Sequence, residues 1–218
     1  STHCISSAAS DVYKRQNVLF SNASLSIEKG SVVGIVGANG IGKSVLFKMI
    51  SGIYHVDEGH ILIRGKEIGK DFDFPPDMGI FIDSPGFVKL FSGFKNLKML
   101  SDIRGIISED DIKDAMKLVG LDPTNSTPVK NYSLGMKQKL GIAQAIMEDQ
   151  DILLFDEPFN ALDSESHQQM RKLVRELKQK EKTILLTSHN NSDILELCDD
   201  IYKIEDQRIE PCSRSLLS

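Results

Sequence analysis

The feature that most constrains the fold of this chain is a glycine-rich run between two apolar segments. Residues 37–44 read GANGIGKS and match the pattern G-x-x-x-x-G-K-[ST]. The apolar run 31–36 before it is typical of a short buried strand, and the run 45–50 after it is typical of the start of a helix. This order favours an α/β fold, because the loop must curl tightly between the end of the strand and the first turn of the helix.

The residue types in this loop suit the binding of a phosphate chain. Glycines let the backbone N–H groups point inward, and the helix N-terminus adds a partial positive charge behind them. We expect Lys43 to neutralise the outer phosphates and the Ser44 hydroxyl to ligate Mg²⁺. The alternative is a glycine-rich turn with a surface lysine, and the flanking elements argue against it. The candidate binding residues are Gly37, Ala38, Asn39, Gly40, Ile41, Gly42, Lys43 and Ser44.

The composition is that of an ordinary globular protein, with 40% hydrophobic and 26% charged residues among 218. A net charge of −5 gives no electrostatic reason to expect a nucleic-acid partner. Cys4, Cys198 and Cys212 are widely separated, which argues against a disulfide framework and a cysteine metal site. No apolar run approaches the roughly 18–20 residues of a membrane-spanning helix. A role at a membrane would therefore need another chain to supply the span.

Residues 1–16 differ from the rest of the chain. They have no starting Met, little periodicity and no apolar core of a signal peptide. The letters DVYKRQ within them resemble translated adapter sequence from sequencing libraries. We therefore interpret 1–16 as foreign or disordered, and exclude them from the reasoning on the fold.

Apolar patterns along the rest of the chain predict a mainly parallel sheet. Alternation over 18–27 favours a first strand, and continuous apolar runs predict buried strands at 60–64, 79–82, 151–155, 183–187 and 201–204. Amphipathic helices are expected to alternate with the strands. Ser164 can cap the helix after the strand 151–155, on which Met170, Leu173, Val174 and Leu177 lie on one face. Between the second and third of those runs, a stretch of about 84–147 is mostly helical. It holds one helix that begins at Ser108 and stops at Gly120, and another over 134–147.

Two carboxylates and one histidine follow predicted strands. Asp156 and Glu157 come directly after the strand 151–155, where a parallel sheet places its ligands. Asp156 is placed to reach a Mg²⁺ bound to Ser44, and Glu157 to orient or deprotonate an attacking water. His189 follows the strand 183–187 and is placed to donate a hydrogen bond to a γ-phosphate. The alternatives are solvated acids at a strand exit and a structural histidine.

Five motifs together carry a family resemblance. In their order and spacing they resemble the Walker A, signature, Walker B, D-loop and switch-histidine motifs of ATP-binding cassette (ABC) ATPases, over residues 17–210. The match to the Walker B motif includes its catalytic glutamate, Glu157. The motifs are GANGIGKS (37–44), YSLGMKQKL (132–140), DILLFDEP (151–158), NALD (160–163) and TSHN (187–190).

The resemblance implies a fold and an assembly. The fold is of the P-loop NTPase (RecA-like) type, α/β, with a mainly parallel sheet, an antiparallel edge and an inserted helical subdomain. It implies one ABC domain over 17–210, with a catalytic core of 17–83 and 150–210 and a helical subdomain of 84–149. It also implies that two cassettes bind head to tail, so that Ser133 and Gly135 contact the γ-phosphate held by the partner. Without the family, Ser133 is a helix cap.

The chain departs from the common family pattern at two motifs. The signature has Leu134 and Met136 where LSGGQ is common, and Asp83 stands where the Q-loop glutamine is expected. Both departures resemble the branch associated with bacitracin-type and lantibiotic-type peptide resistance and export. Asp83 is a candidate metal ligand, and the alternative is that it only signals to a membrane partner. By spacing, Tyr13 is the candidate for stacking on adenine, unless its segment is foreign.

The resemblance implies an ATPase that binds ATP and Mg²⁺ and drives a membrane transporter, with peptides or drugs as exported substrates. Its expected partners are a transmembrane permease and a second ABC ATPase subunit, identical or different, and no nucleic acid. The expected location is the cytoplasmic face of the membrane. The alternatives are a soluble cassette that acts on ribosomes or DNA, and a regulatory cassette that binds ATP without turnover.

Overall fold

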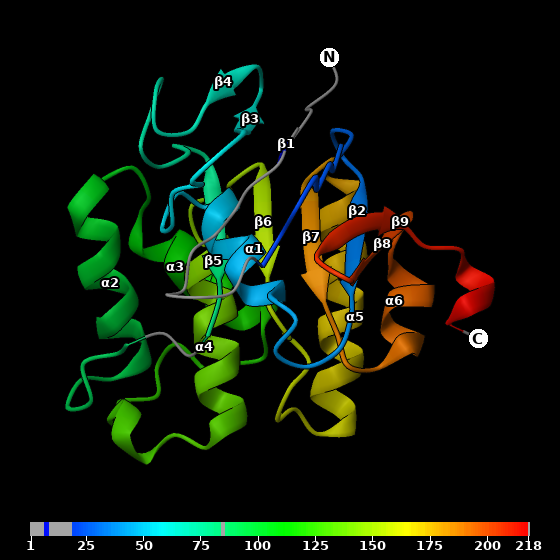
Figure 1. Cartoon of the computed structure of the whole chain (residues 1–218). Coiled ribbons are helices and arrows are strands. Elements are labelled where there is room, and N and C mark those ends of the chain that lie inside the picture. The colour runs from blue at the N-terminus through cyan, green and yellow to red at the C-terminus, as the bar shows by residue number, and fades with distance from the viewer. Residues whose placement is uncertain (1–6, 9–18, 84–85, 218) are drawn as a thin grey trace.

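The computed structural model describes residues 7–8, 19–83 and 86–217. Within these residues, a six-stranded sheet runs in the order β5-β6-β7-β2-β8-β9 (Figure 1). Neighbouring strands are parallel except β8 and β9, which pair antiparallel at one edge. The predicted fold class is therefore confirmed. The strands are β2 (Val32–Val36), β5 (Met78–Phe81), β6 (Ile152–Phe155), β7 (Thr183–Thr187), β8 (Asp200–Glu205) and β9 (Arg208–Pro211).

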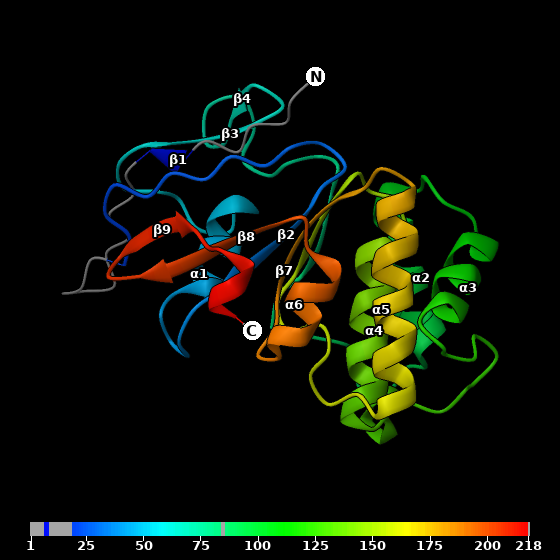
Figure 2. The same cartoon turned by 90° about the vertical axis from the view of Figure 1, so that its right-hand side faces the viewer.

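Helices cover both faces of this sheet, because its strands are apolar on both sides. In β6, Ile152 and Leu154 belong to one buried cluster, whereas Leu153 and Phe155 belong to the other. Burial of each such side chain contributes about 1.5–3 kcal/mol. Figure 2 shows α1 on one side of the sheet and α4 and α5 on the other. The helices are α1 (Lys43–Ile50), α2 (Gly93–Arg104), α3 (Glu109–Leu118), α4 (Leu134–Ile146), α5 (Ser164–Gln179) and α6 (Asn191–Leu197).

A small antiparallel sheet lies beyond α1 (Figure 2). It consists of β1 (Ser7–Ala8), β3 (His60–Ile63) and β4 (Lys66–Glu67), in the order β1-β3-β4. Ile61 and Ile63 of β3 join the buried cluster on the α1 side of the main sheet. The strand predicted at 60–64 is thus present, but it belongs to this second sheet.

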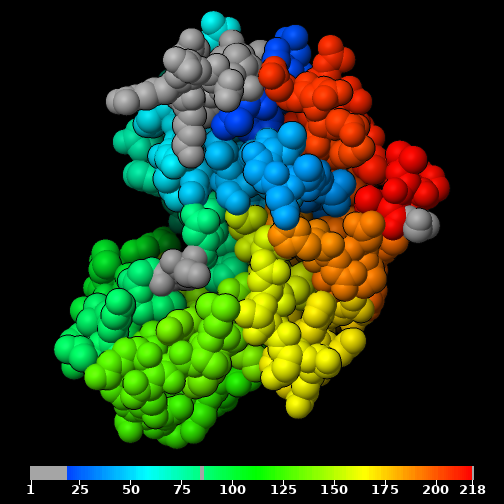
Figure 3. Space-filling view, turned by 60° about the horizontal axis from the view of Figure 1, so that its bottom comes forward, coloured from blue at the N-terminus to red at the C-terminus, as the bar shows by residue number. Residues whose placement is uncertain are grey.

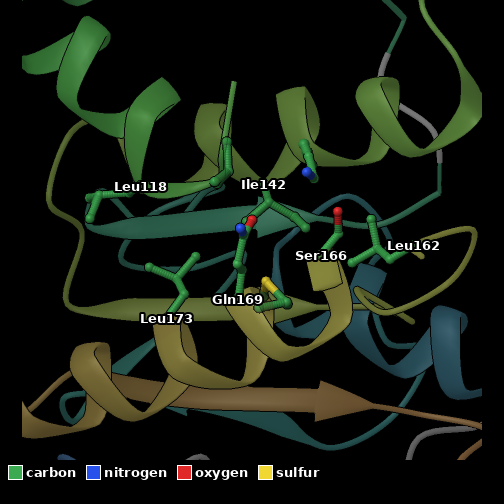
Figure 4. Close-up of a pocket in the computed structure, with 9 residues that line it drawn as sticks. Leu118, Ile142, Leu162, Ser166, Gln169 and Leu173 are labelled. Atoms are coloured by element: carbon green, nitrogen blue, oxygen red, sulfur yellow. The ribbon is translucent and has the colours of Figure 1, made fainter. Parts of the chain in front are cut away.

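The block of helices α2 to α4 packs directly against the main sheet and α5. At Gly79 on β5, a Cβ atom would lie 1.9 Å from the carbonyl oxygen of Ala145, so α4 and β5 approach as closely as glycine permits. Figure 4 shows side chains of α3, α4 and α5, among them Leu118, Ile142 and Leu173, around a cavity. Its volume of about 10 Å³ leaves room for about one water molecule.

Most predicted helix ends agree with the structure, and one cap differs. Ser108 caps α3 in a reciprocal capping box with Asp111, as the pattern of an acidic residue three positions later indicates. Asp163, rather than Ser164, caps α5, and its carboxylate accepts from the backbone N–H of Ser166 at 2.8 Å. Both residue types are good caps, and only the backbone geometry separates neighbouring candidates.

The predicted first strand at 18–27 is wrong for the described part of that range. The alternation is real, because Phe20, Ala23, Leu25 and Ile27 are buried, but no strand is assigned over 19–28. Alternating polarity reports which side chains face the core, whereas a strand also needs ladder pairing. β9 was not predicted, because in Arg208–Pro211 only Ile209 is buried. Across the described residues, no helix is both long and apolar enough to cross a bilayer.

Candidate nucleotide site

The glycine-rich loop 37–44 joins the carboxyl end of β2 to α1, as expected. Gly42 precedes the first helical residue with a φ of 116°, a conformation that side chains rarely adopt. A Cβ atom there would also lie 3.0 Å from the buried ring of Phe20. The backbone of this loop therefore depends on glycine at its last turn.

Lys43 lies inside the curl of the loop. The residue is 9% exposed, and its ammonium donates to the carbonyl oxygens of Gly37 at 2.7 Å and Ala38 at 3.2 Å. The charge is thus held over an open pocket of about 440 Å³. The pocket is lined by Asn39, Gly40, Gly42, Lys43, Ser44, Val45, Asp156, Glu157 and His189.

Figure 3 shows the surface at the carboxyl edge of the sheet, where the light-blue segment around α1 lies against the yellow and orange segments after β6 and β7. The Ser44 hydroxyl donates directly to Oδ2 of Asp156. Thr187, at the end of β7, donates to Oδ1 of Asp156 at 2.8 Å and accepts from the backbone N–H of Glu157 at 2.8 Å. The predicted meeting of Ser44 and Asp156 is present, whereas Thr187 was missed. Its signal was a polar residue at the end of an apolar strand.

The oxygens gathered at this point fit a magnesium ion. A hydroxyl and a carboxylate are the hard oxygen ligands that Mg²⁺ takes, usually with several waters and substrate phosphates. Ser44 and Asp156 already contact each other, so one ion can reach both. Among the described residues, no group of three or more His, Cys, Asp and Glu side chains forms a metal cage. Ser44 and Asp156 would leave the other ligand positions of a magnesium ion to waters and phosphates.

Glu157 and His189 face each other beside this point. The backbone N–H of His189 donates to Oε2 of Glu157 at 3.0 Å, and Nε2 of its ring lies 3.2 Å from Oε1. Burial raises the pKa of the Glu157 carboxyl, and the neighbouring imidazole acts against that shift. Gln138, on α4, donates to the carbonyl oxygen of Glu157 at 2.8 Å. Sequence reasoning missed Gln138, which no local pattern distinguishes from other helix-surface residues.

Ser133 and Gly135 do not line this pocket of the described chain. Ser133 is exposed, and its hydroxyl accepts from the backbone N–H of Met136 at 3.1 Å, which makes it the cap of α4. A Cβ atom at Gly135 would lie 2.8 Å from the carbonyl oxygen of Ala161. The start of α4 thus approaches the loop 160–163 and leaves Ser133 facing outward.

Asp83 lies next to the pocket and is paired with a lysine. Its carboxylate is 2.6 Å from the ammonium of Lys48, and this contact raises the pKa of Lys48. It also lines a second hollow, of about 390 Å³, together with Ser44 and Asp156. Its role as a metal ligand stays a prediction. Tyr13 and Cys4 lie outside the described residues.

Comparisons with known proteins bear on the same residues. A family model described as "ABC transporter" matches residues 20–160. Over 196 residues, or 90% of each chain, the sequence is 40% identical to an uncharacterized ABC transporter ATP-binding protein, YybJ, of Bacillus subtilis (strain 168). The chain belongs to the ABC transporter family. It is an ATP-binding and ATP-hydrolysing subunit of a transporter in this family, as the five motifs predicted.

Two further similarities agree with this assignment to the ABC family. The lantibiotic transport ATP-binding protein SrtF of Streptococcus pyogenes is 34% identical over 197 residues, which are 90% of this chain and 84% of that protein. The predicted resemblance to the lantibiotic branch is thus confirmed. The dimeric structure of the ATP-binding cassette MJ0796 bound to ADP and Pi shares the fold, with a TM-score of 0.82, 20% identity and 98% of each chain covered.

Proposed function

We propose that this ABC subunit hydrolyses Mg-ATP through Glu157 and His189, and that hydrolysis powers the export of peptides across a membrane. The observation that carries the proposal is the chain of contacts from Ser44 through Asp156 and Thr187 to Glu157. These contacts support the proposal, because they bring the carboxylate of Glu157 beside the loop 37–44.

Each side chain has a definite task. Lys43 neutralises the terminal phosphates, since its ammonium already lies over the pocket. Glu157 orients and deprotonates the attacking water. Burial lifts its pKa toward the operating pH, which makes a carboxylate a better base. His189 holds the Glu157 carboxylate and donates to the γ-phosphate. Ser44 and Asp156 would hold Mg²⁺, which would supply charge neutralisation at the phosphates.

A second cassette completes the site. Ser133 is exposed and Leu134 is 62% exposed, although both stand at the start of a helix whose N–H groups favour an anion. In a head-to-tail pair, Ser133 and Gly135 of one cassette contact the γ-phosphate held by Lys43 of the other. We also propose that the chain divides into a core (17–83 and 150–210) and a helical subdomain (84–149). In this proposal the two parts close together around the nucleotide.

A transmembrane permease docks on an apolar surface at α2. We define the α2 surface as Val88, Leu90, Met99, Leu100, Ile103 and Ile106, which are between 37% and 78% exposed. Asn96, which is buried, fixes the preceding loop, because its amide accepts from the backbone N–H of Val88 and donates to the carbonyl oxygens of Val88 and Ser92. A rigid apolar loop costs little to order on binding. This contact holds the chain at the cytoplasmic face of the membrane.

The name of one relative supports the proposed substrate class. The lantibiotic transport ATP-binding protein SrtF, similar over nine-tenths of this chain, is named for lantibiotic transport. That name favours a peptide exporter over a cassette that acts on ribosomes or DNA. The intact Glu157–His189 pair favours turnover over purely regulatory binding.

The substitution Glu157→Gln tests the proposed catalytic role. It keeps the shape and the acceptor for the His189 amide but removes the base, so we expect ATP affinity to stay within about twofold and kcat to fall at least about 100-fold. Glu165→Gln, at an exposed position in the first turn of α5, is the matched control. Hydrolysis by the Glu157 variant within about threefold of wild type would assign the base elsewhere.

Docking is tested separately from catalysis. Ile103→Asp should lower membrane association of the chain when it is co-expressed with a permease, whereas Leu216→Asp, at a similarly exposed apolar position outside the α2 surface, should leave it unchanged. Equal association of both variants would contradict the proposed surface.

A further inference from the structure

A buried carboxylate lies beside the catalytic loops but does not line the nucleotide pocket. Asp193, on α6, has no exposed surface, and three side chains donate to it. Ser188 donates to Oδ2 at 2.9 Å, while the guanidinium of Arg171 and Nε2 of His167 donate to Oδ1 at 2.7 Å and 2.8 Å. A buried charge is tolerated only when it is paired and bonded in this way. We call Asp193, Ser188, Arg171 and His167 the carboxylate anchor.

The carboxylate anchor contacts the loop that carries His189. Ser188 is the residue directly before His189, and it is itself buried. Besides donating to Asp193, its hydroxyl accepts from the backbone N–H of Asn190 at 3.1 Å. The backbone on either side of His189 is therefore tied to Asp193 through a single hydroxyl.

The carboxylate anchor also contacts the loop that carries Glu157. The ring of His167 stacks on Phe159, with centroids 4.9 Å apart and planes inclined by 23°. Phe159 stands two residues after Glu157 and is 6% exposed. Stacked rings of this kind attract each other beyond the effect of burial alone. His167 thus has two functions in one ring, a hydrogen bond to Asp193 and a stack on Phe159.

The carboxylate anchor thus contacts the loops of the two residues that face each other in the pocket. Glu157 and His189 touch through the His189 amide and imidazole. Their loops follow different strands, β6 and β7, so their separation depends on what joins the loops behind the pocket. Hydrogen bonds to a fixed carboxylate set that separation more narrowly than apolar packing would, because they constrain direction as well as distance.

We propose that His167 and Asp193 are positioning residues, which hold Glu157 and His189 at their working separation by linking the two loops in series. The inference rests on the roles proposed above for Glu157 and His189. The hydrogen bond from His167 to Asp193 and the stack of His167 on Phe159 form one continuous link between the loops. Losing either contact therefore has the same effect as losing both.

Three substitutions at His167 test the series link. His167→Phe keeps a ring on Phe159 and removes the donor to Asp193, whereas His167→Gln keeps a donor and removes the ring. His167→Ala removes both. In steady-state Mg-ATP hydrolysis by the purified full chain, each variant should lower kcat by about tenfold, with the KM for ATP within about twofold. Independent contributions would instead make the loss in His167→Ala the product of the other two, about 100-fold.

Arg175→Gln is the matched control for general weakening between α5 and α6. Arg175 is on α5 and pairs with Glu196 on α6, as Arg171 does. Among the described residues, no hydrogen bond or ion pair joins Arg175 or Glu196 to Ser188 or Phe159. We expect its kcat to stay within about twofold of wild type. A loss in Arg175→Gln equal to that in His167→Phe would assign the effect to helix packing and overturn the proposal.

Amide hydrogen exchange gives a readout that does not depend on turnover. All three His167 variants should speed exchange in both segments, 157–160 and 187–191, whereas Arg175→Gln should speed neither. Faster exchange in only one segment would overturn the series link. If Glu157→Gln keeps its turnover, the proposed catalytic roles fail, and the exchange result still decides whether the carboxylate anchor joins the two loops.

Discussion

The two halves of the nucleotide site differ within one chain. Around the loop 37–44, Lys43 and Asp156 are 9% exposed and each is hydrogen-bonded to a neighbouring element or to the loop itself. At the start of α4, Ser133 is exposed and bonds only within its own helix turn in the described chain. The first half is preorganised by burial and mutual contacts, whereas the second is a surface. The difference teaches that the chain assembles by itself the groups proposed to hold phosphate, and presents outward the groups proposed to close over it.

Lys43→Ala removes a charge from the preorganised half of the site and should have the largest effect on ATP binding. It removes a charge-assisted contact to phosphate worth about 2–3 kcal/mol, so we expect ATP affinity to fall by roughly 30–150-fold. Titration calorimetry with ATP and Mg²⁺ measures the change. Lys203→Ala, on β8, removes an exposed lysine that pairs with Glu205 and is the control. An unchanged affinity in Lys43→Ala would contradict the loop assignment.

Ser133→Ala sharpens the comparison, because a cap and a phosphate contact predict different outcomes. Loss of either helix cap, in Ser133→Ala or in Ser108→Ala on α3, should cost about 1 kcal/mol of unfolding free energy. If Ser133 also serves the partner's site, only its variant should lower ATP turnover, by about tenfold, while ATP affinity of the single chain stays unchanged.

Urea unfolding and steady-state hydrolysis on the two serine variants separate these outcomes. Equal turnover in both variants would leave Ser133 as a helix cap alone, and the outward-facing half of the site would lose its proposed role.

The smallest expected effect is a pH-dependent gain in stability in Glu157→Gln. Burial raises the pKa of Glu157 above its ordinary value of 4.5, so folding disfavours the charged form. Such a carboxyl contributes its stability below the ordinary pKa and loses that contribution as pH rises through the folded pKa. The Gln variant should therefore have a higher Tm than wild type at pH 7, and this gain should vanish near pH 4.

Asp163→Asn gives the reverse sign and serves as the reference. The amide of Ser166 lowers the pKa of Asp163, so its contribution is present above the ordinary pKa and is lost as pH falls through the folded pKa. The Asn variant should have a lower Tm at pH 7, with the difference vanishing at low pH. A Glu157→Gln variant less stable than wild type at pH 7 would mean that His189 outweighs burial in the native state.

Much of the site was predictable because local patterns encode it. The loop 37–44 needs glycine for its backbone conformation, and it needs a strand before it and a helix after it. All of these can be recognised from residues that are close together in the sequence. Asp156 and Glu157 were predictable from their place at a strand exit. Thr187 had a weaker signal, a polar residue at the end of an apolar strand. Gln138 and Asp193 had none, since each is an ordinary residue for its element and gains its role only from a distant contact.

By itself, the sequence determined most of the helices and main-sheet strands and the glycine-rich loop, because hydrophobic periodicity and glycine geometry act over a few residues. Only the tertiary structure decided which side chains meet. Ser44 and Asp156 touch across 112 positions because the order β6-β7-β2 brings the carboxyl ends of these strands to one edge. The same order joins His167 and Asp193 behind that edge. Such contacts depend on how strands and helices pack in three dimensions, which the pattern within any one segment does not record.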